Sequence, residues 1–173
     1  KYMKIGNKDT PNIAIVATQG DVTTSKSVIT TLGMLSIATA GALTNVRGVL
    51  AANGATQIDA ASLDNNHGTL ASVTGDLRVT TSGTTDNTSG SLLAAGDTEL
   101  ANSGVVNTDG KVSGRSLAID THNGTLQNLR GTLTAGSTVA ERQAEGELQR
   151  EQPHSHHQPV ASATTDTIPT VAW

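Results

Sequence analysis

The chain has 173 residues, the length of one domain, with a formal net charge of -4 at pH 7 and a pI near 5.6. It has no Cys, no Phe, one Trp and one Tyr, which excludes a disulfide framework, a thiolate metal site, a cysteine nucleophile and an aromatic core. Its 11 Lys and Arg are scattered along an acidic chain and exclude the basic surface of a nucleic-acid-binding protein.

The first 32 residues show no clear repeat. We expect residues 1–32 to be an irregular amino-terminal segment that forms one imperfect repeat unit at most. The chain starts at Lys1 rather than Met, and its first ten residues lack the apolar run and cleavage site of a secretory signal. We therefore expect an internal piece of a longer protein. No stretch approaches the roughly 18 apolar residues that span a bilayer, so we expect no transmembrane segment.

Between residues 33 and 139 one pattern, apolar-x-Asn-x-x-Gly-x-apolar, occurs five times. The segments are LTNVRGVL (43–50), LDNNHGTL (63–70), TDNTSGSL (85–92), VVNTDGKV (105–112) and LQNLRGTL (126–133), with Thr85 the one departure at the first position. Their shared residues are Asn45, Asn65, Asn87, Asn107, Asn128, Gly48, Gly68, Gly90, Gly110 and Gly131, in steps of 20, 22, 20 and 21 residues. A second series, Gly33, Gly54, Gly75 and Gly96, recurs every 21 residues.

Short runs of alternating apolar residues lie between these glycines, at 35–37, 77–79 and 117–119. Alternation over three residues predicts very short strands. A unit of about 20 residues cannot bury its apolar side alone, whereas stacked units can. The sequence therefore predicts an all-β fold, a right-handed parallel β-helix with coils of about 20–21 residues. Proline is absent from residues 12–152, which suits continuous sheet.

The repeated positions predict two structural ladders. Glycine supplies φ > 0 at a sharp corner and asparagine tolerates it, so the shared Asn and Gly residues are expected to form a corner ladder. The asparagine amides are expected to hydrogen-bond along the stack, with successive Cα atoms about 5 Å apart. A buried core ladder of aliphatic side chains is expected at Leu50, Leu70, Leu92, Val112 and Leu133.

The composition changes near Ala140. Residues 140–152 are rich in Glu and Arg, and Ala140, Ala144 and Leu148 recur at helical spacing, so we expect a short charged helix there. Residues 153–173, rich in His, Ser, Thr and Pro, are expected to be a disordered tail. The tail carries His154, His156 and His157, which we interpret as solvated side chains because they lie in a proline-flanked tail without Cys.

The segments LTNVRGVLAANG, LDNNHGTLAS, DLRVTTS and LAIDTHNGTLQNLRGTLTAG resemble the filamentous haemagglutinin repeat family, from about Gly33 to Val139. Such repeats form the shafts of two-partner-secretion exoproteins of Gram-negative bacteria, among them adhesins, haemagglutinins and contact-dependent growth-inhibition proteins. The resemblance implies a secreted or cell-surface shaft fragment, an outer-membrane secretion partner, and contact with glycans or receptors of host or neighbouring cells. No segment resembles the family's secretion domain or its toxin regions.

Two alternatives remain beside this shaft hypothesis: a carbohydrate-processing β-helix enzyme or tail spike, and a non-functional remnant of a truncated exoprotein gene. An enzyme needs carboxylates that converge at one place, within about 10 Å. Here Asp21, Asp76 and Asp97 each follow a glycine as a turn signature, and the remaining aspartates are dispersed. His67 and His122 are expected at exposed turns. We expect no catalytic activity, no cofactor and no metal.

Overall fold

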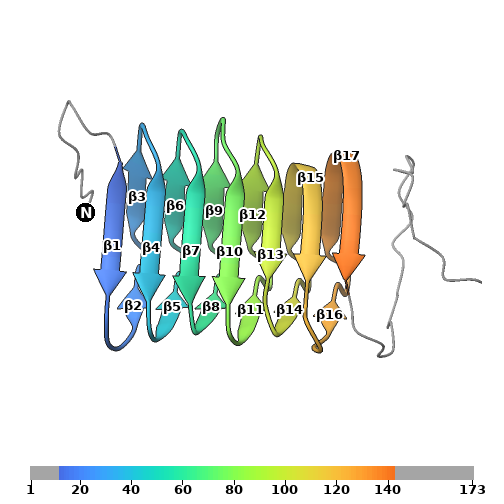
Figure 1. Cartoon of the computed structure of the whole chain (residues 1–173), viewed down its shortest axis with the longest axis horizontal. Coiled ribbons are helices and arrows are strands. Elements are labelled where there is room, and N and C mark those ends of the chain that lie inside the picture. The colour runs from blue at the N-terminus through green and yellow to red at the C-terminus, as the bar shows by residue number, and fades with distance from the viewer. Residues whose placement is uncertain (1–11, 143–173) are drawn as a thin grey trace, which may run out of the picture.

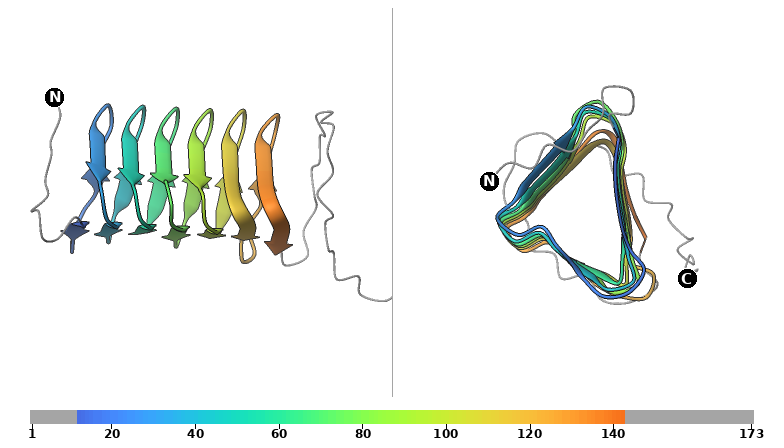
Figure 2. Two further views of the ribbon diagram at one scale, coloured as in Figure 1. Left: turned by 90° about the horizontal axis from the view of Figure 1, so that it is seen from above. Right: turned by 90° about the vertical axis from the view of Figure 1, so that its left-hand side faces the viewer.

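The computed structural model describes residues 12–142, which form an elongated parallel β-solenoid with a triangular cross-section (Figures 1 and 2). Six coils of about 21 residues stack along the long axis, and each coil contributes strands to three faces. All pairs of neighbouring strands are parallel. The all-β parallel solenoid and the coil length predicted from the repeats are confirmed.

Each face of the triangle is built from equivalent strands of successive coils. The first face consists of β1 (Ile13–Ala17), β4 (Leu35–Thr39), β7 (Thr56–Ala60), β10 (Leu77–Thr81), β13 (Thr98–Ala101) and the second half of β15 (Lys111–Asp120). The second consists of β2 (Val22–Thr23), β5 (Ala42–Thr44), β8 (Ser62–Asp64), β11 (Thr84–Asp86), β14 (Gly104–Val106) and β16 (Leu126–Gln127). The third consists of β3 (Val28–Thr31), β6 (Val49–Ala52), β9 (Thr69–Ser72), β12 (Ser91–Ala94) and the first half of β15, with β17 (Thr132–Arg142) paired along β15.

The three edges between faces differ in how much they vary. The asparagine corner joins the second face to the third with the same four-residue turn in every coil, beginning at Thr24 or at one of the five repeat asparagines. The variable corner joins the first face to the second with connections of different length. The glycine corner joins the third face to the first, and there the amide of Gly54 donates to the carbonyl oxygen of Gly33 at 2.9 Å and that of Gly96 to Gly75 at 2.9 Å.

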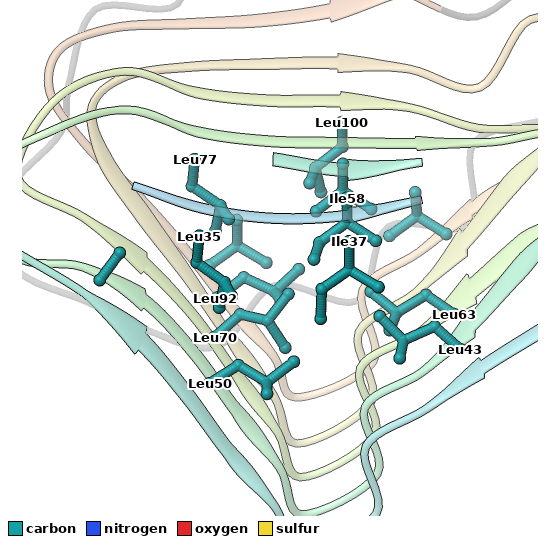
Figure 3. Close-up of a cluster of buried hydrophobic side chains, with 14 of the residues drawn as sticks. Leu35, Ile37, Leu43, Leu50, Ile58, Leu63, Leu70, Leu77, Leu92 and Leu100 are labelled. Carbon is teal, nitrogen blue, oxygen red and sulfur yellow. The ribbon is translucent and has the colours of Figure 1, made fainter. Parts of the chain in front are cut away.

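Aliphatic side chains fill the interior in columns that run along the axis (Figure 3). Leu50, Leu70, Leu92 and Val112 occupy successive coils of the third face in register, and all four have no exposed surface. Burying one such side chain stabilises the fold by about 1.5 to 3 kcal/mol. Leu133 differs, because it packs on Val112 in the last described coil and is only partly buried.

The first described coil is more regular than the sequence predicts. Instead of an irregular segment, residues 13–31 form three strands in register with the second coil, with Ile13 paired to Leu35 and Ile29 to Leu50. The Asn-x-x-Gly pattern fails here because Thr24 stands at the asparagine position and Ser27 at the glycine position. Both substitutes are small hydroxyl residues that the same turn accommodates.

The expected helix from Ala140 is wrong at its start. Strand β17 continues to Arg142 and pairs Ala140 with Ala118 and Glu141 with Ile119. The second half of β15 offers a complete row of backbone partners, while an isolated helix of about 13 residues is marginal in water. The rest of the expected helix and the tail with His154, His156 and His157 lie outside the described residues.

Candidate functional site

The most regular polar feature is the asparagine corner. The side-chain Nδ2 of Asn45 donates to Oδ1 of Asn65 at 2.8 Å, and the contact repeats from Asn65 to Asn87 at 2.8 Å, from Asn87 to Asn107 at 2.7 Å, and from Asn107 to Asn128 at 2.8 Å. The first four asparagines have no exposed surface. A continuous amide ladder therefore runs inside this edge.

Each rung also holds its own turn. Nδ2 of Asn87 donates to the carbonyl oxygen of Gly90 at 3.3 Å, and the amide of Gly90 donates to the carbonyl oxygen of Asn87 at 3.0 Å. In the first coil Thr24 takes the asparagine position, and its hydroxyl donates to Oδ1 of Asn45 at 2.8 Å. The hydroxyl supplies one donor where an amide supplies two, so Thr24 continues the ladder without the bond to its own turn.

The corner glycines serve a purpose other than the expected positive φ. In every described turn of the asparagine corner the positive φ, between 52° and 56°, belongs to the residue before the glycine position, which Ser27 occupies in the first coil: Lys26, Arg47, His67, Ser89, Asp109 and Arg130. A Cβ on Gly68 would lie closer than 3.0 Å to the carbonyl oxygen of Asn45 and to Oδ1 of Asn65, and Gly48, Gly90, Gly110 and Gly131 are equally confined. Glycine is required because the ladder leaves no space for a side chain.

The residues with positive φ form an exposed column along the asparagine corner. Lys26 and Arg47 stand in the first two coils, whereas Asp109 and Arg130 neutralise each other in the last two through two hydrogen bonds of 2.7 Å. The Arg130 guanidinium lowers the pKa of the Asp109 carboxyl below its ordinary value. Both side chains are largely solvated, so the pair contributes little to stability.

A second ion pair lies at the glycine corner. Arg115 donates to both carboxylate oxygens of Asp97, at 3.0 and 2.8 Å. Hydrogen bonds from Arg115 first, and then from Ser116, lower the pKa of Asp97. The same contact with Asp97 raises the pKa of Arg115. This pair joins two successive coils on the outer surface.

A depression of about 500 Å³ lies on the first face beside the variable corner. Its walls come from β1, β4, β7 and β10 and consist mainly of small side chains such as Ala38, Ala60 and Thr80. Asp59 is the only carboxylate among the lining residues, and its Oδ2 accepts a hydrogen bond of 2.8 Å from Gln57. One carboxylate cannot provide the acid and base pair that glycoside hydrolysis needs.

The other aspartates that the sequence singled out hold turns. Oδ1 of Asp21 accepts the amide of Ala42 at 2.7 Å at the variable corner, and Oδ1 of Asp76 accepts the amide of Asp97 at 2.8 Å at the glycine corner. The shared Gly-Asp signature thus belongs to two different corners.

Asp64 and Asp86 are register neighbours on the second face. Their Oδ1 atoms accept the amides of Asn66 and Thr88 at 3.0 and 2.8 Å. Among the described residues no three His, Asp or Glu side chains gather closely enough to hold a metal ion.

The two described histidines lie on exposed turns. The ring of His67 contacts the side chain of Asn66, and Nδ1 of His122 lies 3.0 Å from the carbonyl oxygen of Asn102.

The sequence Asn87-Thr88-Ser89 has the form of a glycosylation site, but Asn87 is fully buried in the ladder. The folded shaft therefore keeps that amide from a modifying enzyme.

The repeating Asn-x-x-Gly corner agrees with a known family. The family model described as "Haemagglutinin repeat" matches residues 5–46, 44–89 and 72–165. The chain belongs to the haemagglutinin repeat family. No curated protein and no solved structure matches it. Haemagglutinin repeats are generally structural and non-enzymatic, and the family is one of exoproteins. Within residues 12–142, no helix has the length and apolarity needed to cross a membrane.

Two features of these haemagglutinin repeats go beyond the sequence interpretation, which allowed residues 1–32 one imperfect repeat unit at most. The first coil, with Thr24 and Ser27, is detectable as VTTSKSVI (22–29) placed 21 residues before LTNVRGVL. The second is a buried contact between Thr85, the one departure from the pattern, and Asn102. No sequence signal pairs these two residues, because their side chains meet only when the coils stack.

Proposed function

We propose that this chain is a shaft segment of a secreted filamentous exoprotein, a rigid stalk that holds binding or effector regions away from the cell surface. The observation that carries the proposal is the amide ladder, which passes without interruption from Asn45 to Asn128. A chain whose residues are committed to stacking identical turns is suited to length and stiffness. Membership of the haemagglutinin repeat family supports this role.

The mechanism is mechanical. Six coils at about 4.8 Å each give a rod of about 29 Å. Backbone hydrogen bonds on three faces and the amide ladder on one edge connect every coil to the next, so bending the rod requires several bonds to stretch together. Cells are separated by far larger distances, so the whole exoprotein would need many more coils.

The location and partners in this proposal follow from the family. The stalk would stand on the outside of a Gram-negative cell after export through an outer-membrane secretion partner. It would serve adhesion or contact-dependent inhibition, with glycans or receptors of the opposing cell bound by other regions of the longer protein. The largely uncharged outward side chains of the third face, such as Thr30, Ala51 and Ala71, suit a spacer rather than a binding surface.

The test inserts the full chain into the shaft of a two-partner-secreted exoprotein and measures both export and shaft length by electron microscopy. We expect export to be kept and the shaft to lengthen by about 29 Å. An insert carrying Asn87→Ala is the matched control and should impair export or suffer proteolysis. A native insert that blocks export, or leaves the length unchanged, would contradict the proposal.

A separate assay addresses catalysis. The purified chain is incubated with a panel of bacterial and host oligosaccharides, and new reducing ends are measured. We expect none above the buffer control. Cleavage that is lost in Asp59→Asn would overturn the stalk proposal in favour of a carbohydrate-processing β-helix enzyme, because Asp59 is the carboxylate that lines the depression.

A further inference from the structure

Two buried polar side chains in adjacent coils differ from the residues at the equivalent positions of the other coils. Thr85 stands in register between Leu63 and Val105 on the second face and has no exposed surface. Asn102 directly follows β13 in the next coil and is also fully buried. Each is a deviation from the pattern of its own column.

These two deviations meet. The hydroxyl of Thr85 donates to Oδ1 of Asn102 at 3.0 Å, and the hydroxyl of Thr81 lies 2.7 Å from the same oxygen and 2.7 Å from the carbonyl oxygen of Gly83. A hydroxyl has one proton, so Thr81 donates to only one of the two oxygens. If the amide is turned over, Nδ2 instead donates to both threonines. In either orientation Thr81 and Thr85 are its partners, and Nδ2 as placed has none among the described residues.

No other described pair of coils repeats this contact. The residues equivalent to Thr85 in the second, third, fifth and sixth coils are Leu43, Leu63, Val105 and Leu126. The residues equivalent to Asn102 are Thr39, Ala60, Thr81 and Thr121. The asparagine corner, in contrast, repeats the same Asn-x-x-Gly turn from the second coil to the sixth and cannot distinguish one of these coils from another.

We propose that Thr81, Thr85 and Asn102 form a register lock, a buried polar contact that makes the fourth coil (β10 to β12) stack on the fifth and prevents a coil from being skipped. Nearly identical coils allow such slippage, because the backbone ladders accept any coil as partner and the entropy cost of closing a loop grows only slowly with its length. The register lock supplies the distinction that the repeats lack.

Both possible skips leave a buried polar group without a partner. If the fourth coil loops out, Asn102 stacks on Ala60 and Leu63. If the fifth coil loops out, Thr85 stacks on Leu126, and the shorter Thr121, whose hydroxyl donates to the carbonyl oxygen of Gly124 at 3.1 Å, takes the place of Asn102. An unpaired buried group lowers the population of such a state by roughly tenfold to a hundredfold.

The chain has no Cys, so introduced cysteine pairs can report the register directly. Thr69, Ser91 and Lys111 occupy one outward-facing column in the third, fourth and fifth coils. The pair Thr69→Cys with Ser91→Cys reports correct stacking. The pair Thr69→Cys with Lys111→Cys reports a skipped fourth coil, because in the native register these Cα atoms are about 10 Å apart, beyond disulfide reach.

Each pair is placed in three backgrounds of the full chain: native, Thr85→Val with Asn102→Thr, and Leu43→Val. The double variant gives positions 85 and 102 the residue types found at the equivalent positions of neighbouring coils, Val as at 105 and Thr as at 81, and so removes the register lock. Leu43→Val is a control for a mild change in the core. After refolding from denaturant in a glutathione buffer, the skip disulfide is quantified by mass spectrometry. We expect it to rise at least fivefold in the double variant and to stay unchanged in the control. An unchanged skip disulfide in the double variant would overturn the proposal.

Thermal unfolding supplies a second readout. Thr85→Val and Asn102→Thr should each lower the Tm by several degrees, because each leaves a buried polar partner without its hydrogen bond. The double variant should recover at least half of the summed loss, and Thr85→Ser, which keeps the hydroxyl, should stay close to native. Losses that simply add in the double variant, or a double variant that does not fold, would show that the residues do not act as one unit and would overturn the register lock.

Discussion

The asparagine corner and the variable corner perform the same geometric task and solve it differently. At the asparagine corner every described coil uses a four-residue turn with the positive φ at the same position. At the variable corner the connection ranges from the five residues 121–125 between β15 and β16 to the single residue Ala61 between β7 and β8.

The difference follows from what each corner must bond. A turn whose side chain donates to the coil above and accepts from the coil below cannot change its length without breaking two buried hydrogen bonds. Turns at the variable corner bond through their backbones, as when the amide of Gly83 donates to the carbonyl oxygen of Ala61 at 2.7 Å, and through side chains that change from coil to coil, such as Asp21 and Asn102. Constancy in this solenoid therefore marks side-chain hydrogen bonds that repeat from each coil to the next, rather than turning itself.

The largest effect is expected from breaking the ladder in the middle. Asn87→Ala removes the acceptor of Asn65 Nδ2 and the donor to Asn107 Oδ1. Two buried groups left unpaired should lower the free energy of unfolding by about 2 to 6 kcal/mol. Urea denaturation measures it, with Thr88→Ala on the same turn as a control near zero. A loss below about 1 kcal/mol for Asn87→Ala would show that the buried amide bonds do not account for the difference between the asparagine corner and the variable corner.

The core beside the corner gives the next effect. Leu92→Ala should cost about 2 to 5 kcal/mol through lost burial and a cavity, because Leu92 has no exposed surface. Leu93→Ala, on the outward side of the same strand, should cost much less. Equal losses for the two variants in chemical denaturation would mean that the phase of this strand is reversed.

The residues also show what the sequence could and could not reveal. The coils can be recognised in the sequence at the asparagine corner, because few residues can replace a buried amide. The asparagines from Asn45 to Asn128 therefore recur at nearly constant spacing. Thr24 hides the first coil because a hydroxyl fulfils part of the same role. The strand at Ala140 to Arg142 depends on a partner about 22 residues earlier, which local helix preference does not register.

A substitution at a residue with positive φ should have a smaller effect and should stabilise the fold rather than destabilise it. Ser89 adopts φ 53°, a conformation that asparagine tolerates better than serine. Ser89→Asn should therefore raise the free energy of unfolding by about 0.5 kcal/mol, and Ser91→Asn, on the adjacent strand, should not. A decrease for Ser89→Asn in urea denaturation would show that the side chain, rather than the backbone, limits this position.

The smallest effect concerns the exposed ion pair at the corner. The pKa of Asp109 lies below its ordinary value of 3.8 in the folded chain, chiefly through hydrogen bonds from Arg130. The stabilisation is therefore complete above the unfolded pKa and is lost as the pH falls through the folded pKa. The free energies of unfolding of the native chain and of Asp109→Asn, measured by urea denaturation, should differ slightly at neutral pH and converge in acid. A gap that widens on acidification would reverse this assignment.

The central claim is tested most directly by placing the same Gly-Ser insertion at each corner and comparing the free energies of unfolding. Between Thr108 and Asp109 the insertion separates Asn107 from Gly110, whose carbonyl oxygen accepts from Asn107 Nδ2 at 3.3 Å, and it should cost about 3 kcal/mol or more. Between Thr18 and Gln19, two exposed residues of the variable-corner connection 18–21, it only lengthens a connection that already varies, and should cost below about 1 kcal/mol. Equal losses at the two corners would contradict the account.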